Sequence, residues 1–222
     1  MTYDTSKDPR ILVAHHACGR LKQALQQKLG IRRSMPKERM TALTAAADSA
    51  VMTLRYTYQE PADLVKMDAM RDLQEAVQEL AVALDPFLTA EEAPPLLRAN
   101  VAWCLRTLSG LPGRLEGPAD SMAAGADLVV VKVSIVSKLG KHNLWRTRVS
   151  DGNTEYTVVT NIPGVRPGDT MAVAFLPPRE VGGEVSEAMY LGSEKRTEPP
   201  GTPLSPTQVD AREAASILHE DL

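Results

Sequence analysis

The stretch DLVVVKVSIVSKLGKHNLWRTRVSDGNTEYTVVTNIPGVRPGDTMAVAFLPPREVGGEVSEAMYLGS, residues 127–193, decides the fold of the C-terminal half. Five short runs rich in β-branched and apolar residues predict strands at 128–137, 144–149, 155–160, 171–176 and 188–191. Glycine, proline, asparagine and aspartate separate these runs, and Asp151-Gly152 is the strongest hairpin cue among them. Five strands in about 65 residues favour a small closed barrel, because closure removes exposed sheet edges.

The first predicted hairpin is basic. Between positions 128 and 150 the sequence has five cationic residues and no acidic residue. The cations are Lys132, Lys138, Lys141, Arg146 and Arg148. Trp145 lies among them and His142 lies close by in the sequence. Cations neutralise phosphate and an aromatic ring stacks on a base, so this pattern is typical of a groove for single-stranded nucleic acid. The alternative is a solvated strand face with Trp145 in the core.

The segment after the fourth run resembles the closing segment of the EMAP-type tRNA-binding domain. The positions that match this family are Leu176, Pro178, Gly183, Ser186 and Met189, and Val158-Val159-Thr160-Asn161 resembles an internal step of the same domain. Ala188 stands where the family has glycine. The helical N-terminal half followed by this domain also resembles a group of predicted archaeal RNA-binding proteins. The resemblance implies an oligonucleotide/oligosaccharide-binding (OB) barrel that docks structured RNA, chiefly tRNA.

The residues and the resemblance together predict an RNA site. Lys138, Lys141, Arg146 and Arg148 are expected to contact phosphate, and Trp145 or His142 to stack on a base. Asn161, Arg179 and Ser186 complete the predicted site. The resemblance implies that Ser186 faces the RNA, whereas its place at a turn is equally typical of a hydroxyl that bonds to the backbone.

The N-terminal half shows helical periodicity. Helices are predicted from Pro9 to Gly30, over 37–59, over 62–84, and from a cap near Thr89 to Leu108, and four helices with short turns predict a bundle. The predicted architecture is therefore α+β: a helical domain (1–113), a linker (114–126), a five-stranded OB-fold barrel (127–196) and a proline-rich tail with a short helix (197–222).

Composition narrows the class of protein. Apolar residues make up 43% of the chain, enough for folded cores. The two cysteines are too few for a disulfide framework and fit a reducing cytosol. The N-terminus lacks the apolar core of a signal peptide, and no apolar run reaches the length of a membrane span. We therefore expect a cytoplasmic protein.

Catalytic motifs are absent from the sequence. It contains no phosphate-binding glycine-rich loop, no Cys-x-x-Cys and no nucleophile elbow. His15 and Cys18 share a helix face, but two ligands do not make a metal site. We expect no catalytic residues, no metal and no cofactor.

Two functions remain open. The first is a non-catalytic RNA-binding protein, with tRNA or another structured RNA as the ligand. Arg32, Arg33, Lys37 and Arg39 then form a secondary basic patch, or else an ordinary solvated loop. The second is a protein-interaction module in which the barrel binds an aminoacyl-tRNA synthetase and the bundle forms a homo-oligomer.

Overall fold

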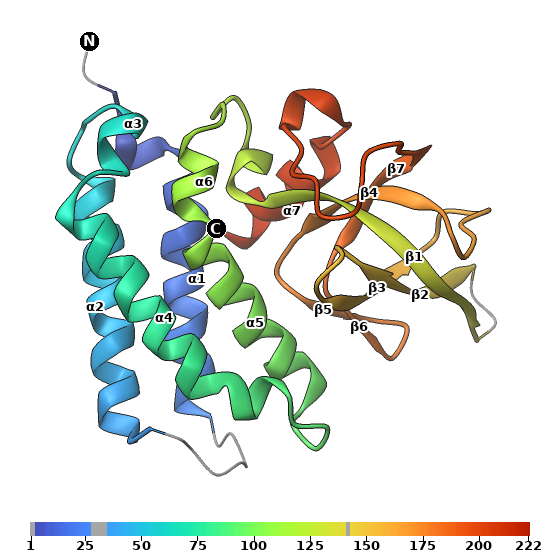
Figure 1. The fold of residues 1–222 in the computed structure, drawn as a ribbon, viewed down its shortest axis with the longest axis horizontal. Helices are drawn as coiled ribbons and strands as arrows, with labels where there is room; N and C mark the ends of the chain where they lie inside the picture. Colours follow the sequence, from blue (N-terminus) through green and yellow to red (C-terminus); the bar gives the residue numbers. More distant parts are fainter. Residues whose placement is uncertain (1–2, 28–34, 141–142) are drawn as a thin grey trace. The chain divides into compact units, whose positions relative to one another are not determined.

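The structure is a computed structural model and describes residues 3–27, 35–140 and 143–222. It divides into two compact units, here called the helical domain (Met1–Ala119, with Leu222) and the sheet domain (Asp120–Asp221). A helical N-terminal region is followed by a five-stranded antiparallel sheet and a short C-terminal helix (Figure 1), which confirms the predicted α+β class.

The helical domain is built on four long helices. They are α1 (Pro9–Gln26), α2 (Lys37–Arg55), α4 (Asp68–Leu88) and α5 (Pro95–Ser109), with short helices η1 (Thr5–Lys7), α3 (Pro61–Leu64) and α6 (Leu111–Leu115) between or beside them. Helices α1 and α4 each pack against both α2 and α5. Asp8 caps α1 by accepting a hydrogen bond from the Arg10 amide, and Pro9 occupies the first turn, where no amide hydrogen is needed.

Two predicted helix boundaries are wrong. The predicted helix over 62–84 is split into α3 and α4, and α4 continues through Pro86 to Leu88. Phe87 is buried, so packing of the last turn outweighs the missing amide of the proline. Helix α5 begins at Pro95 and not at the cap predicted near Thr89.

A buried ion pair holds the N-terminus of α1 to the end of α6. The Arg10 side chain is 1% exposed, and its Nη2 lies 2.6 Å from Oδ2 of Asp8. Its Nη1 donates to the carbonyl oxygens of Arg114, Leu115 and Gly117, at 3.2, 3.2 and 2.5 Å. These carbonyls lie at and just beyond the end of α6, where helical carbonyls run out of amide partners, so Arg10 adds donors that the end of the helix lacks.

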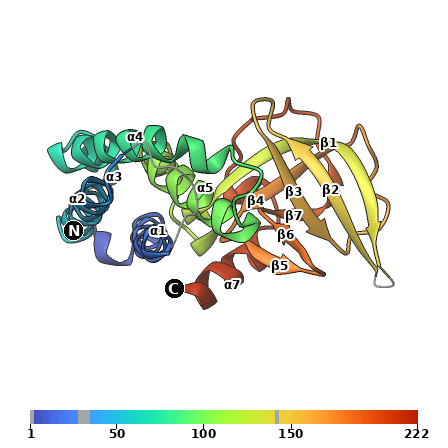
Figure 2. The same ribbon diagram turned by 90° about the horizontal axis from the view of Figure 1, so that it is seen from below.

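The sheet domain contains one large antiparallel sheet. Its strands, in spatial order, are β3 (Glu155–Thr160), β2 (Leu144–Ser150), β1 (Asp127–Leu139), β4 (Thr170–Phe175) and β7 (Met189–Lys195). Strands β1, β2 and β3 lie side by side (Figure 2). A separate hairpin pairs β5 (Arg179–Val181) with β6 (Glu184–Ser186). The core face is formed mainly by Val129, Val131, Val133, Val149, Val158, Met171, Val173, Phe175, Ala188 and Tyr190.

A bulge in β1 changes which side chains share a face. Val133 pairs with Val149, but the next pair is Ile135 with Arg148, so Ser134 is an extra residue. Beyond the bulge Val136 packs against the core, where simple alternation from Val133 would have placed Ile135.

The predicted closed barrel is not formed: the sheet remains open, with β3 and β7 at its edges. The amide groups on the outer edge of β3 are bonded by other means. The Thr157 amide donates to Oε2 of Glu187 at 2.7 Å, and the Val159 amide donates to Oγ of Ser186 at 3.0 Å. The side chains of Glu187 and Ser186 therefore accept hydrogen bonds from two amide groups that a closing strand would otherwise bond.

The segment after β7 folds back onto the sheet domain. Thr202 and Leu204 bond to β1: the Val130 amide donates to the Thr202 carbonyl at 3.0 Å, and the Leu204 amide donates to the Leu128 carbonyl at 2.8 Å. Helix α7 (Arg212–Asp221) then packs against the short helix η2 (Met122–Gly125).

Candidate nucleic-acid interface

The predicted basic residues of the first hairpin lie on two faces of the sheet. Arg146 and Arg148 alternate with the buried Thr147 and point away from the core. Lys138 pairs directly with Trp145 on the core-side face, because the bulge has exchanged the faces of β1. Lys141 and His142 lie outside the described residues.

The outward face of β2 carries exposed positive charge, here called the arginine face (Arg146 and Arg148). Nη1 of Arg146 lies 3.0 Å from Oε1 of Glu184, and both side chains are more than a third exposed. Arg148 is exposed and stands opposite Ile135, whose side chain is 54% exposed. An exposed ion pair is weak in water, so Arg146 can exchange Glu184 for phosphate at little cost.

A cleft of about 650 Å³ borders the arginine face. It brings together Asn161, Arg179 and Ser186, three predicted site residues that are far apart in the sequence. Its apolar lining includes Leu144, Val159, Ile162, Val181, Met189 and Ile217. Val159 is the cross-strand neighbour of Arg146, so the cleft and the arginine face form one continuous surface.

Arg179 is tied to the C-terminal helix. Its Nη2 lies 2.8 Å from Oδ1 of Asp221, and the Arg179 side chain is 47% exposed. Glu213 and Ile217 of the same helix also line the cleft. Helix α7 therefore forms one wall of the cleft, and any ligand of Arg179 competes with Asp221 or shares the guanidinium with it.

The Ser186 side chain bonds to the backbone that forms the cleft. Its Oγ accepts a hydrogen bond from the Val159 amide at 3.0 Å and donates one to the Ala188 carbonyl at 2.9 Å. Both partners are backbone groups. Ser186 therefore has the second of its two predicted roles, a hydroxyl that bonds to the backbone at a turn.

Replacing Ser186 by alanine is expected to lower the free energy of unfolding of the sheet domain by about 1–3 kcal/mol, because two partners lose their hydrogen bond. RNA affinity of the folded protein is expected to stay unchanged. The matched control is Ser193→Ala, since Ser193 lines the same cleft and is exposed. Thermal melting and RNA titration on one preparation check both values, and an unchanged melting temperature with weaker RNA binding would assign Ser186 to the ligand.

The secondary basic patch is only partly described. Arg32 and Arg33 lie outside the described residues, whereas Lys37 and Arg39 are exposed at the start of α2. Nη2 of Arg39 lies 2.8 Å from Oε2 of Glu79. The described part of this patch therefore consists of one lysine and one arginine that is already paired.

Both cysteines are buried in the helical domain. Burial raises the pKa of Cys18 and of Cys104 to about 12, so both thiols stay protonated at neutral pH. Over residues 3–27, 35–140 and 143–222 no group of three or more metal-ligating side chains is found. In the same ranges no helix has the length and apolar character that crossing a membrane requires.

Sequence reasoning missed the residues that complete the cleft. Ile217 and Glu213 come from the C-terminal helix, and Glu184 neutralises Arg146. The sequence predicts a short helix in the C-terminal tail, but it does not indicate that this helix lines the cleft.

Comparison with known proteins identifies the helical half. The family model described as "Alpha helical domain" matches residues 1–117. No curated protein matches the chain. Among solved structures, the crystal structure of a MetRS-related protein from Pyrococcus horikoshii is similar at 24% identity, over 36% of this chain and 89% of that chain, with a TM-score of 0.33. The family model spans more than half of the sequence, and the chain therefore belongs to the alpha helical domain family.

Proposed function

We propose that the protein binds RNA through the sheet domain and catalyses no reaction. The observation that carries this proposal is the continuity of the arginine face with the cleft: Arg146 and Val159 are cross-strand neighbours, and Val159 lines the cleft. A backbone phosphate on the arginine face would place the attached nucleotide beside the cleft.

The chemistry of the surface suits a single-stranded segment of a structured RNA. Arg146 and Arg148 neutralise phosphates, and each neutralised phosphate releases counterions. The apolar side chains of the cleft receive an unstacked base or ribose. The amide of Asn161, which is exposed at the cleft, both donates and accepts hydrogen bonds and can therefore bond to a base edge or a 2′-hydroxyl.

Transfer RNA is the ligand we propose, on the resemblance of residues 176–189 to the EMAP-type domain. The choice of tRNA as the ligand is a prediction from that resemblance. Lys138 and Trp145 lie on the opposite face of the hairpin, so they are not assigned to the same surface as the two arginines. A synthetase that delivers or receives the tRNA is the protein partner that fits this role.

The double variant Arg146→Ala, Arg148→Ala is expected to weaken tRNA binding about tenfold per arginine, since a hydrogen bond to a charged group contributes about 1.5–3 kcal/mol. The slope of log affinity against log salt should fall by about 1.4, from two lost phosphate contacts to single-stranded RNA. The matched control is Arg166→Ala, Arg212→Ala, which removes the same charge from two exposed positions elsewhere in the domain. Equal losses in both double variants would show that only net charge matters, and no loss in the first would place the RNA on another surface.

A further inference from the structure

A cavity in the helical domain carries a second group of polar side chains. Helix α1 contributes Leu12, His15, His16, Gly19, Arg20, Lys22, Gln23 and Ala24, and Gln27 follows directly after the helix. Other elements also line the cavity: Asp48 and Arg55 come from α2, Leu97 and Asn100 from α5, and Leu222 is the last residue of the chain. The opposite face of α1 is buried, so the polar face is a separate surface of the same helix.

Two guanidinium groups in this cavity are held by neutral partners. Arg20 donates through Nη2 to Oδ1 of Asn100, and its guanidinium carbon lies 5.7 Å from the ring centre of the buried Trp103. Arg55 bonds through Nη1 to Nδ1 of His15 at 3.3 Å. Within the described part of the chain neither arginine forms an ion pair with a side-chain carboxylate.

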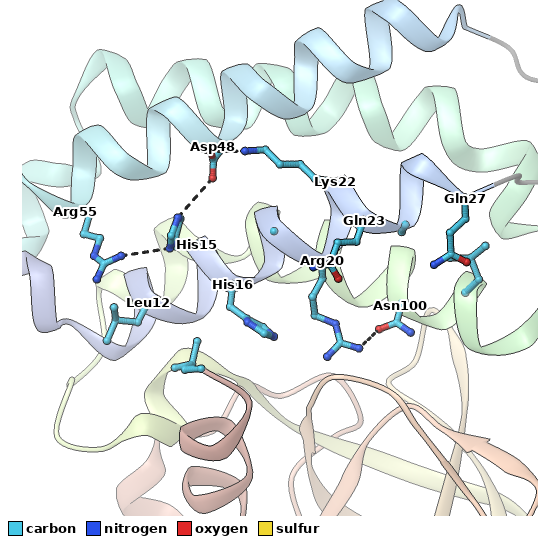
Figure 3. Close-up of a pocket in the computed structure, with 14 residues that line it drawn as sticks. Leu12, His15, His16, Arg20, Lys22, Gln23, Gln27, Asp48, Arg55 and Asn100 are labelled. Atoms are coloured by element: carbon cyan, nitrogen blue, oxygen red, sulfur yellow. Dashed lines mark hydrogen bonds and ion pairs between the residues drawn. The ribbon is translucent and has the colours of Figure 1, made fainter.

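Lys22 and Asp48 form an ion pair at the same cavity. Nζ of Lys22 lies 2.5 Å from Oδ2 of Asp48, and Nε2 of His15 lies 3.8 Å from Oδ1 of the same carboxylate. Because Nδ1 of His15 accepts from Arg55, its proton lies on Nε2 and faces Asp48. Asp48 therefore lies beside His15, which bonds to Arg55 (Figure 3).

Two arginines that reach the cavity from different helices, Arg20 from α1 and Arg55 from α2, suit a ligand with more than one anionic group. Figure 3 shows His16 between the two guanidinium groups. Guanidinium groups bind phosphate through two parallel N–H donors, and Arg20 uses one donor in its bond to Asn100.

Gly19 supports a ligand site on independent grounds. It lies in the interior of α1, where glycine destabilises a helix relative to alanine. Its position requires no glycine, because a Cβ there would meet no atom within 4 Å. Gly19 lines the cavity beside Arg20 and His16, so the missing side chain leaves the helix backbone open to a bound molecule.

We infer that this cavity binds a small molecule that carries two or more linked phosphate groups, with Arg20 and Arg55 as the phosphate ligands. His16 and the amides of Gln23 and Gln27 line the same space and bond to the rest of the ligand. All residues that line this cavity belong to the helical domain as defined above, Leu222 included.

The test uses the full chain and inorganic pyrophosphate as the probe, titrated by calorimetry at low salt. Saturable binding is expected, with at least tenfold weaker affinity in Arg20→Gln and in Arg55→Gln. Gly19→Leu should abolish binding while the melting temperature holds or rises, because leucine is a good helix former in open space. The control is Gln26→Leu, an exposed position of α1 that does not line the cavity, and it should bind like the unmodified protein.

Three results would overturn the inference. They are no saturable binding of pyrophosphate, equal affinity in the two arginine variants and the unmodified protein, and undiminished binding in a folded Gly19→Leu variant. A further experiment asks whether the phosphates bound in the cavity belong to a small molecule or to RNA. It uses the Arg146→Ala, Arg148→Ala variant, in which RNA binding by the sheet domain is expected to be weakened. Displacement of pyrophosphate by a single-stranded RNA oligomer there would contradict the assignment to a small molecule.

Discussion

Replacing Arg10 by methionine is expected to destabilise the helical domain by about 3–5 kcal/mol, the largest effect of any single substitution considered for this chain. The Asp8 carboxylate would be left buried without its cation, and three carbonyls at and just beyond the end of α6 would lose the donor that Arg10 supplies. Chemical denaturation of the full chain, followed by far-UV circular dichroism, measures the loss. The matched control is Arg212→Met, which removes an arginine from an exposed pair with Asp210 and should leave stability unchanged.

The pH dependence separates the lost ion pair from lost packing. Burial alone would raise the pKa of Asp8, but hydrogen bonds from Arg10 and Tyr3 outweigh it and lower this pKa below 3.8. The pair therefore stabilises the fold above that pH, and its contribution is lost as the pH falls. In Arg10→Met the pKa of Asp8 should instead be raised, so the deficit against the unmodified protein should shrink at acid pH. A deficit that is constant with pH would attribute the loss to packing alone.

Replacing Gly201 by alanine is expected to destabilise the sheet domain by more than the 1–3 kcal/mol that a strained backbone conformation typically costs. Gly201 has a φ of +88°, and an added Cβ would lie 2.6 Å from the carbonyl oxygen of Asp151. The Gly201 amide donates to the Val130 carbonyl at 2.8 Å, so relief of the clash would detach this segment from β1.

The matched control for that substitution is Gly164→Ala. Gly164 has a similar φ of +84°, but a Cβ there meets no atom within 4 Å. The difference between the two variants in the free energy of unfolding therefore isolates the close approach to Asp151. Equal losses would mean that the segment after β7 shifts without cost and contributes little to the sheet domain.

The main elements could be predicted from the sequence because their signals are local. The predicted strands at 144–149, 155–160 and 171–176 match β2, β3 and β4 to within a residue. The sequence predicts no strand for the hairpin of β5 and β6, whose strands have three residues each and are separated by Gly182-Gly183. Strands this short carry too few residues for an alternating pattern.

The candidate site was less predictable because it depends on contacts between distant residues. A bulge of one residue at Ser134 decides that Lys138 and the arginine face lie on opposite sides, and no residue type marks that position. Barrel closure failed as a prediction because the outer edge of β3 is bonded by the side chains of Ser186 and Glu187, which only the register reveals. The meeting of Asn161, Arg179 and Ser186 in one cleft could be expected only from the family resemblance.

Titration of the purified full chain with tRNA at two salt concentrations tests RNA binding by the arginine face and the cleft most directly. We predict saturable binding at low salt that weakens steeply as salt rises, since Arg146 and Arg148 bind through phosphate neutralisation. The Arg146→Ala, Arg148→Ala variant should give a shallower slope. Absence of tRNA binding at low salt, with the sheet domain folded, would contradict RNA binding and favour a protein partner for this surface.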